Sequence, residues 1–238
     1  MRAEGKGFFV TATDTSVGKT VISAALIKAL VYLGYRTGTM KPIETGCIRR
    51  EGMLIPSDGM FLKAVSGMSE KINLITPCTY ERPLAPMVAA EIEGYEVDIQ
   101  EIMRSFDLIR KDYEAVVVEG VGGLYVPVKR DYFISDLAKE MGLPLIVVSR
   151  PSLGTLNHTL LTVGHALSSG LEVAGIIINY SMEPEMSIAE ETNVKALKDM
   201  TDVPIIGVFP NLRDLEEETL SREALRSIDL DVIKRAMG

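Results

Sequence analysis

The chain of 238 residues contains no tryptophan and only two cysteines, Cys47 and Cys78. Two cysteines at this separation match no metal-ligand spacing, so they give no support for a cysteine-bound metal. We expect two unpaired thiols in a reducing cytosol. Aromatic side chains are also scarce, at 6% of the residues, and this scarcity says little about function.

The sequence also lacks long apolar runs and an excess of positive charge. No uninterrupted apolar stretch reaches the ~18 residues needed to cross a bilayer. The first ten residues, MRAEGKGFFV, lack the features of a signal peptide, so we expect a cytoplasmic protein with no membrane partner. The net charge of −8 argues against broad attraction to nucleic acid. Any anion must then be bound by local positive groups.

What the sequence does contain is a repeated alternation of apolar runs and helical patterns. Apolar runs without polar alternation predict strands covered on both faces, and hence a parallel sheet. They lie at 7–12, 114–120, 143–149, 172–179 and 203–209, with a weaker one at 36–42. Helical patterns lie at 20–34, 98–111, 133–141, 155–168, 185–199 and 221–228. We predict one α/β domain over residues 1–238, with a doubly wound, mainly parallel sheet.

Residues 43–97 interrupt this alternation. The segment is rich in glycine, proline and charged side chains. In a compact domain, long irregular segments are usually functional loops or lids. We therefore expect an irregular lid here.

The stretch TATDTSVGKT, residues 11–20, follows the first predicted strand and precedes a long helical pattern. This is the context that a phosphate-binding P-loop requires, so we predict that the α/β sheet is like that of P-loop NTPases. Lys19 would reach the outer phosphates, and the Thr20 hydroxyl would ligate magnesium. Ala12 replaces the usual leading glycine and is tolerable if its φ is not positive. The residues expected to bind nucleotide here are Asp14, Thr15, Ser16, Val17, Gly18, Lys19 and Thr20.

Three further residues could complete such a site. Glu119 ends an apolar run, where a carboxylate is costly unless paired, although it could also be solvated at a sheet edge. Lys41 follows the second predicted strand, at the edge where open α/β sheets bind ligands, but most lysines are simply solvated. Asp58 begins a predicted helix and could be only its N-cap.

Together these stretches resemble the dethiobiotin synthetase family. The matching segments are FFVTATDTSVGKT, YRTGTMKPIETG, SDG, VVVEGVGGLYVPV, LGTLNHTLLT and IIIN, in the family's order. The resemblance implies an ATP- and Mg²⁺-dependent enzyme of biotin biosynthesis. Its substrates would be diaminopelargonic acid (7,8-diaminononanoate) and CO₂. A carbamate would be phosphorylated to a carbamic-phosphoric anhydride, and ring closure would give dethiobiotin.

The resemblance also implies residue roles. Lys19 and Lys41 would stabilise charge on the γ-phosphate and carbamate, and Thr15 would contact the reacting centre. The implied magnesium ligands are Thr20, Asp58 and Glu119. The implied nucleotide contacts beyond the P-loop are Glu119, Asn179 at the adenine edge, and Pro210 and Asn211, which would line the base. The implied substrate contacts are Thr15, Lys41, Thr45, Gly122 and Asn157. Asn157 would act across the two-fold interface of a homodimer, unless it is only a helix-surface amide.

Some residues depart from the family, and other functions remain open. Ala12, Ser16 and Met87 depart from its usual residues, which puts substrate specificity and nucleotide preference in question more than the reaction class.

One alternative function is that of a cobyrinate amidase, but neither cysteine lies in a nucleophile-elbow pattern. A second is a ParA- or MinD-like ATPase switch, whose loop has lysine where this chain has Asp14. A third is a catalytically inactive regulatory domain of the same family. The two histidines, His158 and His165, fall on a predicted helix and are expected to be structural.

Overall fold

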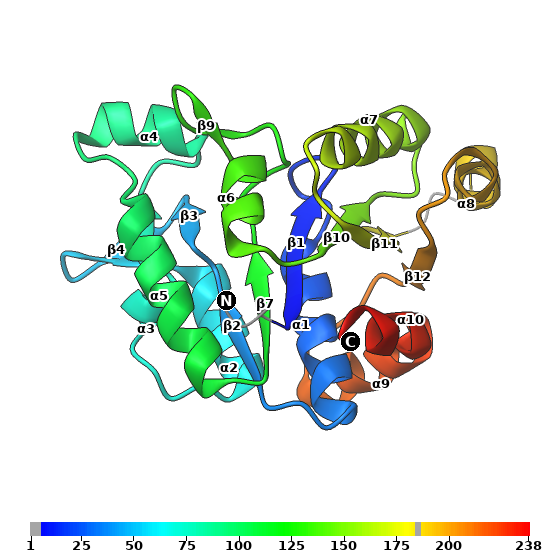
Figure 1. Cartoon of the computed structure of the whole chain (residues 1–238), viewed down its shortest axis with the longest axis horizontal. Coiled ribbons are helices and arrows are strands. Elements are labelled where there is room, and N and C mark those ends of the chain that lie inside the picture. The colour runs from blue at the N-terminus through cyan, green and yellow to red at the C-terminus, as the bar shows by residue number, and fades with distance from the viewer. Residues whose placement is uncertain (1–5, 184–186) are drawn as a thin grey trace.

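The computed structural model describes residues 6–183 and 187–238. Within these residues, the central sheet has six parallel strands in the order β12-β11-β10-β1-β7-β2 (Figure 1). The strands are β1 (Gly7–Ala12), β2 (Thr37–Met40), β7 (Ala115–Glu119), β10 (Leu145–Ser149), β11 (Val173–Asn179) and β12 (Ile205–Phe209). The prediction of a mainly parallel α/β sheet is confirmed.

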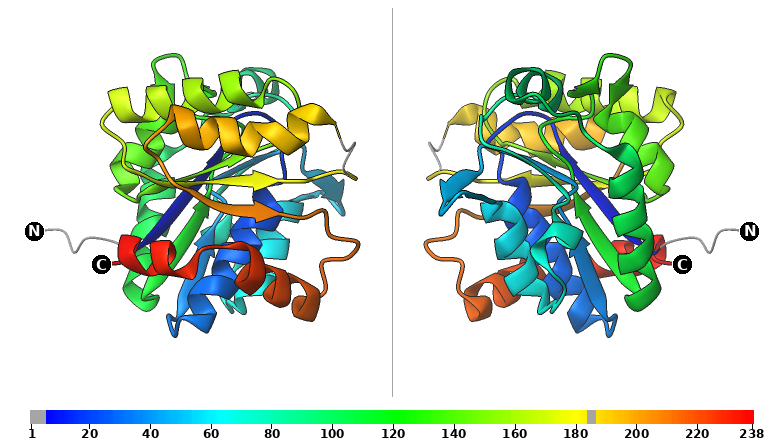
Figure 2. Two further views of the ribbon diagram at one scale, coloured as in Figure 1. Left: turned by 90° about the vertical axis from the view of Figure 1, so that its right-hand side faces the viewer. Right: turned by 90° about the vertical axis from the view of Figure 1, so that its left-hand side faces the viewer.

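Helices cover both faces of this sheet (Figure 2). The adjacent residues Phe8 and Phe9 of β1 are both fully buried, yet they belong to different core clusters on opposite faces. This explains why the strands have continuous apolar runs. One face packs against α1 (Lys19–Tyr32), α2 (Ser57–Ser66), α9 (Glu217–Ser227) and α10 (Leu230–Ala236). The other packs against α5 (Ile99–Asp112), α6 (Ile134–Met141), α7 (Thr155–Ser168) and α8 (Ile188–Met200).

The expectation of an irregular lid over 43–97 is wrong. Besides α2, the segment contains β3 (Ile43–Thr45), β4 (Ile48–Arg50), β5 (Met53–Ile55), α3 (Ile72–Ile75), β6 (Cys78–Tyr80) and α4 (Pro86–Glu93). Most of these elements have only three or four residues, which is too short for a period of two or 3.6 to be recognised. Strand β3 pairs with β6, and β4 pairs with β5.

The remaining elements differ little from the sequence predictions. A short hairpin of β8 (Pro127–Lys129) and β9 (Tyr132–Phe133) follows β7. Helix α10 was not predicted, and positions 185 and 186 of the helix predicted at 185–199 lie outside the described residues. Both cysteines are buried and unpaired, as expected, and burial raises the pKa of Cys47 to about 12 and that of Cys78 to about 11. No helix in the described part of the chain is long and apolar enough to span a membrane.

Parallel strands bring their carboxyl ends to one edge of the sheet. The P-loop follows β1, Lys41 follows β2, Glu119 ends β7, and Asn179 ends β11. Residues that are far apart in sequence therefore meet at this edge, which is where open α/β sheets place their ligands.

Candidate active site

A cavity of about 770 Å³ opens at the carboxyl ends of β1, β2 and β7. It brings together most of the residues that the sequence analysis assigned to phosphate, magnesium and substrate. Its lining residues are Thr15, Ser16, Gly18, Lys19, Thr20, Lys41, Glu44, Thr45, Asp58, Pro83, Leu84, Ala85, Glu119, Val121, Gly122 and Val126.

An ionic cluster lines this cavity. Lys41 Nζ lies 2.5 Å from Glu119 Oε1 and 3.4 Å from Asp58 Oδ2. The Thr20 hydroxyl donates to the same Glu119 oxygen at 3.0 Å. Glu119 is fully buried and Lys41 is 4% exposed, so the alternatives that either side chain is solvated are wrong. Asp58 lies in the first turn of α2 without capping it, so the N-cap alternative is wrong as well.

The two lysines of the cavity have opposite pKa shifts. Burial, with a further contribution from the charge of Lys41, lowers the pKa of Lys19 to about 8. Burial would also lower the pKa of Lys41, but the nearby charges of Glu119 and Asp58 outweigh it and raise that pKa. Lys41 is therefore held as an ammonium by carboxylates, whereas the ammonium of Lys19 would gain stability from a bound anion.

The oxygen donors of the cluster fit Mg²⁺. Glu119 Oε2 is buried and has no hydrogen-bond partner among the described residues. Such an oxygen is costly to bury, and a cation would satisfy it. Mg²⁺ is usually bound by one or two carboxylates together with substrate phosphates. This is compatible with the finding that residues 6–183 and 187–238 contain no group of three His, Cys, Asp or Glu side chains that could hold a metal.

The end of β11 holds the P-loop in place. Gly18, the residue before α1, has a φ of 86°, and a Cβ there would lie 2.1 Å from Asn179 Nδ2. That Nδ2 donates to the Val17 carbonyl at 2.7 Å. The Val17 side chain is buried in the core, so only its backbone can face a ligand. Ala12 is buried and has no positive φ, which explains why alanine is tolerated.

A second, smaller cavity of about 360 Å³ lies at the carboxyl ends of β11 and β12. Two residues predicted to line the nucleotide base, Pro210 and Asn211, line this cavity. Tyr180 also lines this cavity. The residue before it, Asn179, contacts the P-loop. Asn179 itself, which the resemblance implies contacts the adenine edge, is 2% exposed and lines neither cavity.

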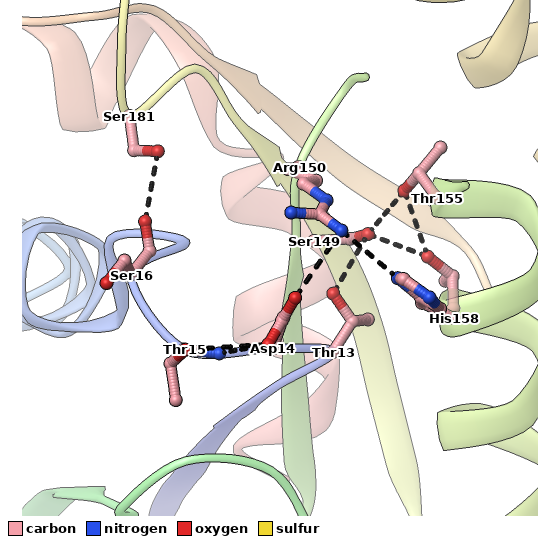
Figure 3. A network of polar contacts seen from close by, with 10 residues as sticks. Thr13, Asp14, Thr15, Ser16, Ser149, Arg150, Thr155, His158 and Ser181 are labelled. Carbon is pink, nitrogen blue, oxygen red and sulfur yellow. Dashed lines mark hydrogen bonds and ion pairs between the residues drawn. The ribbon is translucent and has the colours of Figure 1, made fainter. Parts of the chain in front are cut away.

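A polar network connects the P-loop to β10 and α7 (Figure 3). Asp14 accepts a hydrogen bond from the Thr15 N–H at 2.8 Å, and its other oxygen lies 3.4 Å from Arg150 Nη2. The same Arg150 nitrogen lies 3.4 Å from His158 Nδ1. Ser149 Oγ lies 2.7 Å from the hydroxyl oxygens of Thr155 and Thr159, which ties the end of β10 to the start of α7. Asp14 thus braces the loop and does not line the large cavity.

Two further positions named in the sequence analysis also lie away from the large cavity. Asn157 is exposed on α7, so within one chain the structure does not bring it to Lys41. Met87 lines a separate cavity of about 550 Å³ beside α4 and β8, so this departure from the family lies outside the site.

Glu44 and the apolar residues 83–85 also line the large cavity, although the sequence pattern did not indicate it. Glu44 lies in the KPIETG stretch, one residue before Thr45, but nothing in its spacing indicates that it is 5% exposed. The two residues before 83–85 are bound to α4, because the Glu93 carboxylate accepts from the N–H groups of Glu81 and Arg82, at 3.2 and 2.9 Å.

Comparison with known proteins identifies the family. A family model described as an AAA domain matches residues 6–219. An ATP-dependent dethiobiotin synthetase BioD of Thermodesulfovibrio yellowstonii is 44% identical over 234 residues, covering 95% of this chain and 98% of that protein. The protein of the same name from Bacillus subtilis strain 168 is 42% identical over 234 residues, covering 98% and 99%.

Solved structures show the same fold at low identity. The MinC:MinD cell division complex of Aquifex aeolicus matches with a TM-score of 0.55 at 16% identity, covering 98% of this chain and 96% of that one. The cell division ATPase MinD of Pyrococcus furiosus matches with a TM-score of 0.51 at 15% identity, covering 98% and 97%. These matches confirm the P-loop NTPase fold and nothing beyond it. The family itself is shown by the two relatives above, at 44% and 42% identity over nearly the whole chain: the chain belongs to the family of ATP-dependent dethiobiotin synthetases.

Proposed function

We propose that this protein carboxylates diaminopelargonic acid with CO₂ and closes the product to dethiobiotin at the expense of ATP. One amine attacks CO₂ and loses a proton, which gives a carbamate. The carbamate oxygen attacks the γ-phosphorus of ATP, the bond to the β–γ bridging oxygen breaks, and ADP leaves, which gives the carbamic-phosphoric anhydride. The second amine then attacks the carbamoyl carbon, loses a proton and expels phosphate. The observation that carries this proposal is the meeting of Lys19, Lys41, Asp58 and Glu119 in one cavity.

The triphosphate would lie along the P-loop, where backbone N–H groups and the start of α1 favour an anion. Lys19, whose ammonium is destabilised by burial, would bind the outer phosphates. The base would occupy the smaller cavity lined by Pro210 and Asn211, with Asn179 between base and phosphates.

Mg²⁺ would be held by Thr20, Asp58 and Glu119, where it would neutralise charge on the phosphates. Lys41 would stabilise negative charge on the carbamate and on the transferring phosphoryl group. The carboxylates of Glu119 and Asp58 hold the Lys41 ammonium at this edge of the cavity.

The diamine would bind at the open side of the same cavity, against Thr15, Thr45 and Gly122. Holding both amines next to one carbon makes ring closure an intramolecular step. The anhydride would hydrolyse in water, and the apolar residues 83–85 would help to exclude water from it. We further propose a homodimer in which Asn157 of the partner chain completes this pocket, and we retain the prediction of a single domain over residues 1–238.

A diamine-dependence assay tests the proposal. Purified protein with ATP, Mg²⁺ and bicarbonate should release phosphate only when diaminopelargonic acid is present, and mass spectrometry should detect dethiobiotin. Parallel reactions with CTP and GTP would establish the nucleotide preference. Diamine-independent hydrolysis, or hydrolysis stimulated only by a protein partner, would instead favour the ATPase switch, for which the MinD likeness offers only a fold relationship.

A further inference from the structure

Glu44 is a buried carboxylate that the reaction described above does not use. Its Oε1 accepts from the Asp58 N–H at 3.0 Å, and its Oε2 accepts from the Gly59 N–H at 2.9 Å. The side chain comes from β3, while both donors belong to the first turn of α2. Both oxygens of Glu44 are therefore engaged by the backbone of the helix that carries Asp58.

Helix α2 depends on this contact because it has no cap of its own. The residue before it is Pro56, and no side chain of that residue can accept from the helix. The first N–H groups of a helix lack intrahelical partners and carry partial positive charge. The Glu44 carboxylate, which lies outside the helix, accepts from the N–H groups of Asp58 and Gly59. This contact holds the backbone that carries the Asp58 side chain.

Close packing at Gly59 also restrains this helix turn. A Cβ on Gly59 would lie 2.0 Å from Thr76 Oγ1 and 3.6 Å from Glu44 Oε2. Glu44 is 5% exposed and Thr76 is 3% exposed, so the turn packs against two buried side chains. This arrangement sets the position from which Asp58 Oδ2 lies 3.4 Å from Lys41 Nζ.

We propose that Glu44 is a positioning residue for the divalent cation: it fixes the start of α2 so that the Asp58 carboxylate faces Lys41 and Glu119. The inference rests on the proposed function, in which Asp58 is a magnesium ligand. Glu44 is not among the proposed magnesium ligands, and each of its carboxylate oxygens accepts from a backbone N–H of α2.

Cation binding tests this role directly. Mn²⁺ replaces Mg²⁺ and is titrated by electron paramagnetic resonance in the presence of a non-hydrolysable ATP analogue. The variants are Glu44→Ala and Glu44→Gln, the second of which keeps the size of the side chain and one acceptor. The matched control is Asp98→Ala, since Asp98 Oδ1 accepts from the Glu101 N–H at 2.9 Å and caps α5, which carries no site residue.

The expected result is a loss of Mn²⁺ affinity of about tenfold in Glu44→Ala, a size typical for partners of metal ligands. Glu44→Gln should recover part of it, and Asp98→Ala should bind Mn²⁺ as the unchanged protein does. Unchanged affinity in both Glu44 variants would overturn the proposal, and so would an equal loss in Asp98→Ala. Should Glu44→Ala fail to fold, Glu44→Gln decides alone. Diamine-dependent turnover of the unchanged protein, measured on the same preparation, separates failure of this inference from failure of the proposed function.

Discussion

At the scale of single residues, Lys41 links structure and proposed chemistry. Its ammonium compensates the charge of Glu119, a carboxylate that is fully buried at the end of β7. Removing one partner of a buried ion pair leaves the other charge uncompensated, which is far more costly than losing an exposed pair. Lys41 therefore affects the free energy of unfolding and turnover through the same contact.

The variant Lys41→Met separates these effects. Without nucleotide or Mg²⁺, we expect its free energy of unfolding in urea to fall by about 3 kcal/mol. We expect kcat to fall by about 100-fold or more, because a fixed charge on the transition state is lost. The Kd for ATP should change much less. Lys28→Met is the control, since Lys28 pairs with the exposed Glu217 at 2.6 Å and should matter little. Parallel losses in kcat and ATP binding would make Lys41 a nucleotide contact only.

At the scale of elements, the P-loop depends on a strand from a distant part of the chain. Gly18 has a left-handed backbone, and the Asn179 amide at the end of β11 occupies the space where a Cβ would lie. Gly34, after α1, has a similar φ of 92°, but a Cβ added there would have no neighbouring atom within 4 Å. The two glycines thus share their conformation and differ in their surroundings.

This pair gives a matched comparison. Gly34→Ala should cost about 1–2 kcal/mol in the free energy of unfolding, the usual cost of a left-handed alanine. Gly18→Ala should cost more, because Asn179 must move, and it should also weaken binding of a fluorescent ATP analogue. Urea unfolding and nucleotide titration measure the two effects. Equal nucleotide affinity in both variants would show that the contact between Gly18 and Asn179 does not shape the site.

At the scale of the whole molecule, helix α7 presents apolar side chains to solvent. Leu161 is 65% exposed and Leu153, just before the helix, is 84% exposed. Tyr125, which is 67% exposed, lies against His165 of the same helix with ring centroids 4.6 Å apart. Apolar side chains gathered in this way are typical of an association surface. The same helix carries Asn157, the residue proposed to act across a dimer.

Light scattering after size exclusion tests this surface. The unchanged protein should have twice the chain mass of 26.0 kDa. Leu161→Asp should shift the mass toward that of one chain and reduce diamine-dependent turnover. Leu108→Asp is the control, because Leu108 is 51% exposed on α5, which packs beside β2 at the other end of the sheet (Figure 1). A single-chain mass for the unchanged protein would contradict the dimer.

The sequence by itself determined the parallel sheet and the chemistry of its edge. Uninterrupted apolar runs require burial on both faces, and the residues that end those runs, such as Lys41 and Glu119, must then meet at one edge. The P-loop could be recognised because its function depends on consecutive backbone groups, Asp14 to Thr20.

Only the tertiary structure decided the rest of the site. Glu44 and residues 83–85 reach the cavity through elements of three to eight residues, whose periodicity is too short to read. Whether Asp58 caps a helix or faces Lys41 depends on contacts between β3 and α2. The spacing of residues along the sequence does not indicate these contacts. Local sequence patterns specify helices and strands. The burial of a side chain and the residues that it contacts are decided only when distant segments pack together.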